Sequence, residues 1–403
     1  MGIEDRRRGR VVASHQIAVT ALRLAGLFGL VAMVWALRVA VVGGPWWGPV
    51  HAFLLGAVTL AIAGAAQMFT VTWSAAPAPP AWIAGLQRWV HSMGVGLVLV
   101  GVTTRAVGLT VVGGVAVFAG LGLLGFSLVG AIRHSLLRRF DLSARFYLLA
   151  LACAGVGVVL GVVMAAGSAG TRYSVLRIVH GHLNLVGFIG FTIIGTIPTL
   201  LPTFARHRAV SGREAILAWR LALAAAGAMM AGLLLGERAV AVGSLLASGA
   251  LTLVVVGLVA RLGRTGVRGG LPYLQVVVGC AWLASWAVVD GVRLIGNGGG
   301  PVFDRWIAAA VLGGVGQVLL GSLAYLIPVL AGPAPALGAN LHRFDRHRWV
   351  PLAAANSAAL GAVLGAPVVV LVAVGLWSAD FTRRLVGVRR TGPSGTDGAM
   401  ERE

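Results

Sequence analysis

The sequence contains no lysine and little charge of any kind. Only 11% of its 403 residues are charged and 58% are hydrophobic, whereas a soluble globular domain carries about 25% charged residues. All 32 basic residues are arginines, and with 12 acidic residues they give a formal net charge of +20. This composition excludes an ordinary soluble globule and predicts an all-α integral membrane protein. Basic loops at a membrane then explain the positive charge, and nucleic-acid binding is not expected.

Cysteine is scarce, and two further motifs are absent. Cys153 and Cys280 lie far apart inside apolar runs, so neither a disulfide framework nor a cysteine-based metal site is indicated. The glycines at Gly298–Gly300 lack the lysine of a phosphate-binding loop. No small-residue cleavage site follows the first apolar run, so we expect a retained first span instead of a cleaved signal peptide.

Long apolar runs are the dominant feature, since about 20 such residues cross a bilayer as a helix. Ten runs meet this length: 17–42, 49–73, 82–105, 107–132, 146–167, 175–203, 216–235, 239–260, 271–295 and 304–331. A final stretch, 349–385, is interrupted at Gly365-Ala366-Pro367. Because glycine and proline punctuate helices, it can form one helix or two, 349–364 and 367–385.

The arginine clusters decide between these alternatives, because short cytoplasmic loops collect basic residues. The clusters are Arg6, Arg7, Arg8 and Arg10; Arg133, Arg138, Arg139 and Arg145; Arg206, Arg208, Arg213 and Arg220; Arg261, Arg264 and Arg268; Arg343, Arg346 and Arg348; and Arg383, Arg384, Arg389 and Arg390. All fall on one side only if the last stretch is two helices. We therefore predict twelve spans in the plasma membrane of a bacterium, with both termini cytoplasmic. The eleventh span, about 16 residues, is short for a crossing.

A weak internal repeat relates the second, sixth and tenth spans. Starting from Pro49, His180 and Trp306, each has glycine at +7 and +15, and the last two have proline at +22. This register predicts three four-helix units, 17–132, 146–260 and 271–387. They would form one membrane domain, 17–387, between a basic N-terminus, 1–16, and a polar tail, 388–403.

Four histidines lie within predicted spans, where an ionisable side chain marks a functional candidate. His51 and His182 share position +2 of their units, where the third unit has Ala308. His180 and His182 point about 200° apart on a helix, so they suit different partners. Imidazoles from two facing helices can occupy both axial positions of a haem, and hydrogen bonding between helices without any cofactor is the alternative. His91, with Met93, Met68 and Gln67 expected in its neighbourhood, is a candidate copper ligand.

Arginines near the outer ends of the spans could bind haem propionates. The candidates are Arg172, Arg177 and Arg305. In the alternative interpretation Arg293 pairs with Asp290, Arg305 pairs with Asp304, and Arg172 and Arg177 extend to the membrane interface.

These residues resemble the haem-copper oxidase superfamily. His180-Gly-His182, followed by Gly195 and Pro202, resembles the histidine-pair helix of subunit I, and His51-Ala52-Phe53 resembles the helix with the other low-spin haem ligand. Length and repeat are similar to NnrS-type membrane proteins. The stretch Gly64-Ala-Ala-Gln67-Met-Phe-Thr70 to Pro80 is similar to the membrane portion of actinobacterial copper oxidases. The resemblance implies haem, with copper as a second candidate, His51 and His182 on one haem, and His180 facing another cofactor or small ligand.

The sequence also departs from that family. In the oxidases the histidine pair belongs to the third arc, and the copper centre uses consecutive histidines, a pattern that this chain lacks. Oxygen reduction is therefore not expected. The resemblance favours electron transfer, or nitric-oxide or copper handling, with a redox partner such as a cupredoxin or an oxidase subunit. The alternatives are a cofactor-free transporter and a membrane anchor subunit.

Overall fold

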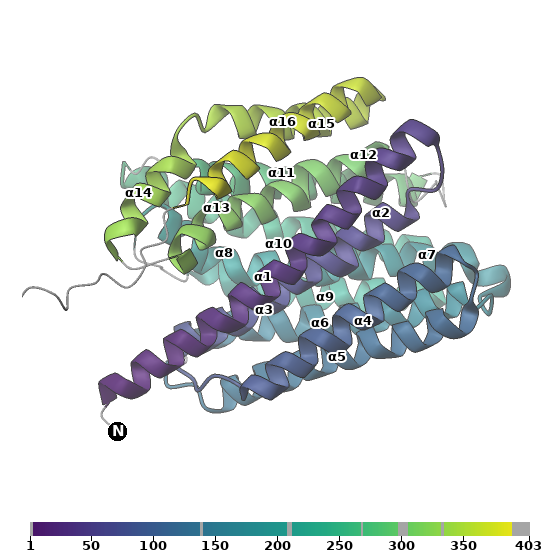
Figure 1. Ribbon diagram of the computed structural model, residues 1–403. Helices are drawn as coiled ribbons and strands as arrows, with labels where there is room; N and C mark the ends of the chain where they lie inside the picture. Colours follow the sequence, from purple (N-terminus) through teal and green to yellow (C-terminus); the bar gives the residue numbers. More distant parts are fainter. Residues whose placement is uncertain are drawn as a thin grey trace, which may run out of the picture. The chain divides into compact units, whose positions relative to one another are not determined.

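Helices make up almost all of the structure. The computed structural model describes residues 3–137, 140–207, 212–266, 269–296, 305–331 and 334–388, and within these ranges there is no strand. The prediction of an all-α fold is confirmed (Figure 1). The tail beyond Val388 and Arg138, Arg139, Arg208 and Arg268 of the basic clusters lie outside the described residues.

The elements in chain order are α1 (Ile3–Val42), α2 (Trp47–His51), η1 (Ala52–Val58), α3 (Thr59–Trp73), α4 (Ala81–Thr103), α5 (Val107–Arg133), α6 (Asp141–Ala165), η3 (Gly170–Arg172), α7 (Tyr173–His182), η4 (Leu183–Gly190), α8 (Phe191–Phe204), α9 (Arg213–Leu235), α10 (Glu237–Arg264), α11 (Leu271–Gly296), α12 (Arg305–Ala309), η5 (Ala310–Gly316), α13 (Gln317–Ala331), α14 (Ala334–Asp345), α15 (Trp349–Leu364) and α16 (Pro367–Val386).

Ten helical segments of the described chain are long and apolar enough to cross a membrane. They correspond to the ten long apolar runs of the sequence, with α2, η1 and α3 forming one span, α7, η4 and α8 another, and α12, η5 and α13 a third. These helices indicate a multi-pass membrane protein that associates with the lipid bilayer.

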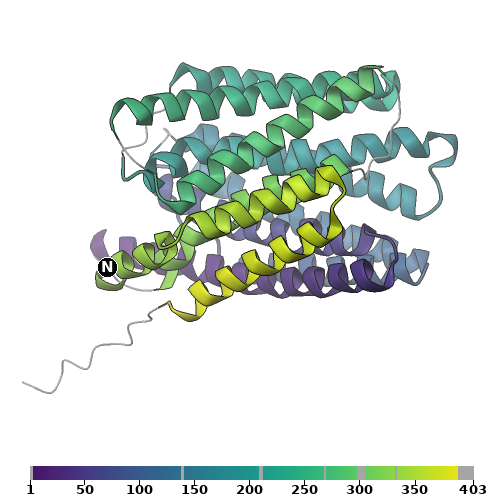
Figure 2. The same cartoon turned by 90° about the horizontal axis from the view of Figure 1, so that it is seen from above.

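The last apolar stretch is two helices, as the sequence predicted. α15 ends at Leu364, and the following Gly365 has a φ of 70°, a left-handed conformation that glycine adopts without strain. Pro367 then begins α16, where its missing N–H would have no helical acceptor. Figure 2 shows the two yellow-green helices folding back on each other. At 16 residues, α15 is shorter than the ten long spans.

Contacts divide the fold into two compact units. Unit 1 contains Met1–Pro198, Ser211–Val254 and Ala287–Val302, and unit 2 contains Thr199–Val210, Val255–Trp286 and Phe303–Glu403. In unit 1, α1 runs beside α3, and α4 pairs with α5 (Figure 1). In unit 2, α15 packs against α12 and α16. The three predicted four-helix units are a different division of the chain, and they stay a prediction.

The second, sixth and tenth candidate spans, which are α2–η1–α3, α7–η4–α8 and α12–η5–α13, each contain a π-helical segment. These segments are η1, η4 and η5, and they begin three, three and four residues after Pro49, His180 and Trp306. Side chains donate to backbone carbonyls in or beside each segment: Thr59 to Leu54, Asn184 to His180, and Gln317 to Gly313. A π-helical turn is uncommon and often accompanies a functional site.

The glycines at +7 and +15 make matching contacts in the three helices. Those at +7 are Gly56, Gly187 and Gly313, and an added Cβ would lie 2.6 Å from Phe28 of α1, 2.8 Å from Cys153 of α6 and 2.9 Å from Trp282 of α11. Those at +15 are Gly64, Gly195 and Gly321, which approach Ala21 of α1, Phe146 of α6 and Gln275 of α11. Glycine thus lets each of these three spans, called the broken helices because a π-helical segment interrupts them, lie close against the helix that precedes it.

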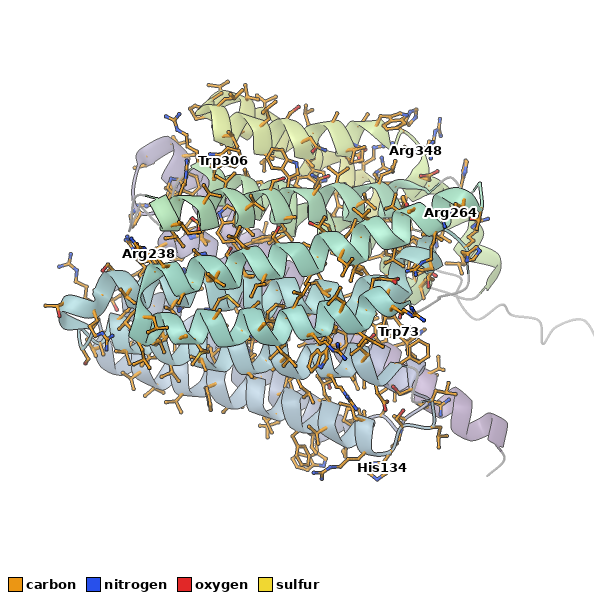
Figure 3. All side chains as sticks on the ribbon, turned by 180° about the vertical axis from the view of Figure 1, so that it is seen from behind. Trp73, His134, Arg238, Arg264, Trp306 and Arg348 are labelled. Carbon is orange, nitrogen blue, oxygen red and sulfur yellow. The ribbon has the colours of Figure 1, made fainter. Side chains whose placement is uncertain are left out.

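Labelled side chains mark the two opposite ends of the helices in each unit. In Figure 3, Trp73 and His134 lie at one end of the helices of unit 1 and Arg238 lies at the other. In unit 2, Arg264 and Arg348 lie at one end and Trp306 lies at the other. This placement follows from helices that run antiparallel along the chain.

Candidate functional site

His51 and His180 lie together in unit 1. His51 is the last residue of α2, and His180 lies in α7. Their ring centroids are 6.2 Å apart, and the ring planes differ by 19°. In the same site the rings of Trp47 and His51 stack with centroids only 4.3 Å apart. The two imidazoles are therefore nearly parallel but separated by more than a direct stacking distance.

The backbone fixes the orientation of both rings. Nδ1 of His51 lies 2.8 Å from the carbonyl oxygen of Trp47, and Nδ1 of His180 lies 2.7 Å from that of Gly157 in α6. A carbonyl only accepts hydrogen bonds, so each Nδ1 carries the proton and each Nε2 keeps its lone pair. Neither Nε2 has a hydrogen-bond partner among the residues that the structure describes. Histidines that bind a metal through Nε2 show this arrangement.

Small residues of α6 leave space for the His180 ring. A Cβ at Gly161 would lie 3.1 Å from Cε1 of His180, and a side chain at Gly157 would meet Asn184. The Asn184 amide donates to the carbonyl oxygen of His180 at 2.8 Å. The π-helical segment η4, which begins at Leu183, directly follows this part of α7. The position of His180 is therefore set by the glycines of α6 and by the hydrogen bond from Asn184.

His182 points away from this pair and has a different partner. Its side chain is buried, its Nδ1 lies 2.9 Å from the carbonyl oxygen of Ile178, and its Nε2 lies 2.8 Å from Oδ2 of Asp290 in α11. The divergence expected for residues two apart on a helix is thus present. The repeat register matched His51 with His182, whereas in the structure His51 lies beside His180. His182 contacts Asp290, the residue that the alternative interpretation of the sequence paired with Arg293.

His91 lies apart from the pair, in α4. It is 1% exposed, and its Nε2 lies 3.0 Å from the carbonyl oxygen of Leu55 in η1. Its Nδ1 is buried without a partner in the described structure. Met93 is 60% exposed, and Gln67 donates to Ala63. In the described part of the chain no three His, Cys, Asp or Glu side chains gather as they would around a metal ion. Copper binding stays a prediction.

The three candidate arginines have different surroundings. Arg172 donates to the carbonyl oxygen of Leu233 at 2.5 Å. Arg177 lies one turn before His180, its guanidinium carbon is 6.0 Å from the Tyr173 ring centroid, and its Nε is buried without a hydrogen-bond partner in the described structure. Arg305 belongs to unit 2, where its guanidinium group lies against Gly365. Arg177 is thus the arginine of unit 1 with an unsatisfied buried donor near the pair.

Sequence reasoning missed the residues that support the histidines. Trp47 and Gly157 contribute carbonyl oxygens, so their side-chain types carry no signal. Asp290 was visible as an acidic residue inside an apolar run, but its partner depends on how α7 packs against α11.

Comparison with known proteins adds no assignment. No protein-family model matches the chain, and no curated protein matches it.

Proposed function

We propose that this protein is an integral membrane haem protein in which Nε2 of His51 and Nε2 of His180 would hold one haem iron. The observation that carries the proposal is the pair of nearly parallel imidazoles with fixed Nδ1 protons and available Nε2 lone pairs. The assignment changes one expectation from the sequence, since His180 replaces His182 as the partner of His51.

The separation of the rings supports a metal between them. Metal bonds to imidazole nitrogen are about 2.0 Å, so two imidazoles that bind one ion have ring centres up to roughly 6 Å apart. The observed 6.2 Å agrees with this value. Two protein nitrogens alone are too few for a tightly held bare ion, because protein metal sites use three or four side chains. A haem supplies the remaining four nitrogens itself.

The surrounding residues suit that group. Held by the two imidazoles of His51 and His180, a haem would supply one-electron transfer. This favours electron transfer over nitric-oxide handling. The carbonyls of Trp47 and Gly157 hold the ring orientations and increase the donor strength of Nε2. The unsatisfied Nε of Arg177 suits an anionic group such as a propionate.

The twelve-span architecture and its repeats belong to the same proposal. The π-helical segments in register support three four-helix units, and so do the +7 and +15 glycines that contact α1, α6 and α11. With α15 and α16 as the last two spans, both termini lie on the cytoplasmic side. A redox partner protein, such as a cupredoxin or an oxidase subunit, would then approach the outer face, where the helix ends carry His51 and His180.

Optical spectroscopy tests the haem assignment. The full chain is purified from haem-replete cells together with His51→Ala, His180→Ala and His182→Ala. His134→Ala is the matched control, because His134 also bonds a backbone carbonyl through Nδ1 but is exposed at the end of α5. We expect a six-coordinate low-spin spectrum that is lost in the first two variants and kept in the last two. Colourless protein, or loss with His182→Ala but not with His180→Ala, would contradict the proposal. Metal analysis of the same samples reports on copper.

A proton-coupled transporter is the second candidate, and the His182–Asp290 pair favours it. The two side chains come from different helices inside the candidate spans and meet at 2.8 Å. Intramembrane pairs of this kind occur in proton relays. Substrate-dependent uptake that Asp290→Asn abolishes, in protein without bound haem, would favour this function over electron transfer.

A further inference from the structure

A second candidate site lies in unit 2 and contains none of the histidines of unit 1. It is a pocket of about 300 Å³ between α14 and the end of α16. The polar residues that line it are Asn340, His342, Arg343, Arg346, Arg383 and Arg384. The sequence predicted only a basic loop here, and the proposed haem function makes no use of it.

A buried arginine, Arg384, connects the two helices that form the pocket. Arg384 is 2% exposed, and its Nε lies 2.5 Å from Oδ2 of Asp380. It also donates to the carbonyl oxygens of Arg343 and Phe344, in the last turn of α14. An arginine at this position satisfies carbonyls that have no partner within the helix. The end of α14 is therefore held to α16 by a buried, hydrogen-bonded contact.

The arginines that line the pocket carry more positive charge than Asp380 balances. Asp380 accepts from Arg383 and Arg384, so one carboxylate faces two guanidinium groups. Arg343 and Arg346 have no side-chain hydrogen bond or ion pair in the described part of the chain, and both are exposed. The four arginines and Asp380 together carry a net charge of +3. A group with at least one negative charge and several acceptor oxygens would complement this pocket.

We propose that this pocket binds a phosphate group. Arginine suits phosphate because its planar fork of donors matches two oxygens at once. The volume exceeds that of one water molecule, about 30 Å³, by roughly tenfold, so a phosphate ester fits together with some water. The phosphate can belong to an anionic lipid headgroup or to a soluble ion. Exposed apolar side chains of the same helix α16, Leu376, Leu385 and Val386, offer a surface for acyl chains.

Native mass spectrometry of the full chain tests the proposal. The protein in detergent is titrated with phosphatidylglycerol, with phosphatidylcholine, and separately with inorganic phosphate against chloride at equal ionic strength. The test variant is Arg343→Gln with Arg346→Gln, which leaves the Arg384 contacts in place. The control is Arg220→Gln with Arg264→Gln, two exposed arginines of α9 and α10 that do not line the pocket. An unchanged unfolding midpoint without ligand checks that the test variant is folded.

We expect phosphatidylglycerol to bind at least tenfold more tightly than phosphatidylcholine, and the test variant but not the control to lose this preference. Protection from unfolding by inorganic phosphate, with no lipid preference, would assign the pocket to a soluble phosphate. The proposal is overturned if neither phosphate source binds, or if the test and control variants lose binding equally, because general surface charge would then explain it. None of these outcomes depends on haem.

Discussion

At the scale of single residues, the site depends on which side of each imidazole is already occupied. His51 and His180 give Nδ1 to backbone carbonyls and keep Nε2 available, whereas both nitrogens of His182 have partners. Three histidines that look equivalent in the sequence therefore have two different roles. His51 and His180 are the proposed ligands, and His182 connects α7 to α11.

The His182–Asp290 contact should contribute to stability and leave the spectrum unchanged. Asp290→Ala or His182→Ala removes a hydrogen bond that involves a charged group, and we expect a loss of about 1–2 kcal/mol from that bond, since Asp290 is 27% exposed. The double variant should lose less than the sum of the two single losses, because the residues act as a pair. Thermal unfolding in detergent measures this coupling. Additive losses would show that the two side chains do not interact.

Crowding of the His180 ring should alter the spectrum. A Cβ at Gly161 already lies 3.1 Å from that ring, so Gly161→Val forces the imidazole to shift. We expect weaker haem retention and partial loss of the low-spin spectrum. Gly122→Val, at a position where a Cβ meets nothing within 4 Å, is the control. A normal spectrum in Gly161→Val would argue against His180 as a ligand.

At the scale of helices, glycine decides how closely the broken helices approach their neighbours. Gly187→Val places new atoms against Cys153 of α6, and Gly313→Val places them against Ala359 and Trp282. We expect each variant to lose about 1–3 kcal/mol from overpacking. Gly249→Val in α10 should cost little, because nothing lies within 4 Å of its Cβ position. Unfolding midpoints of the three variants test this, and equal midpoints would mean that these contacts are not tight.

The turn between α15 and α16 gives a second prediction at this scale. Gly365 has a φ of 70°, and a Cβ there would meet the guanidinium group of Arg305. Gly365→Val should therefore lower stability by about 1–2 kcal/mol, whereas Gly375→Val in α16 has open space. An unchanged midpoint in Gly365→Val would show that the turn adapts easily.

At the scale of the whole molecule, the proposed orientation can be tested by labelling. In a background with Cys153→Ala and Cys280→Ala, we introduce Arg238→Cys, Arg264→Cys or Arg348→Cys. A membrane-impermeant thiol reagent should label Arg238→Cys in intact cells and the other two only after permeabilisation. The reverse pattern would invert the topology. Labelling at Arg348→Cys that differs from Arg264→Cys would contradict the two crossings between them, one by α11 and one by α12, η5 and α13.

The sequence by itself determined the class of protein, because apolar length and arginine placement are local properties. Ten long helices begin and end close to the predicted runs, and the break at Gly365 needed only the preferences of glycine and proline. The positions of the four intramembrane histidines were visible, and so was the glycine register. The sequence missed α14, since its short run of small and polar residues has no clear apolar period.

Only the tertiary structure decided which histidine meets which. The choice of His180 over His182 depends on the carbonyl of Gly157 and the carboxylate of Asp290, which are 23 and 108 residues away along the chain. The basic pocket likewise forms because Arg384 reaches back 40 residues to the end of α14. The register of the repeat aligned the helices with one another along the sequence. It could not give the rotation of each helix about its own axis. That rotation is set by packing between helices, and it selects the side chains that face the site.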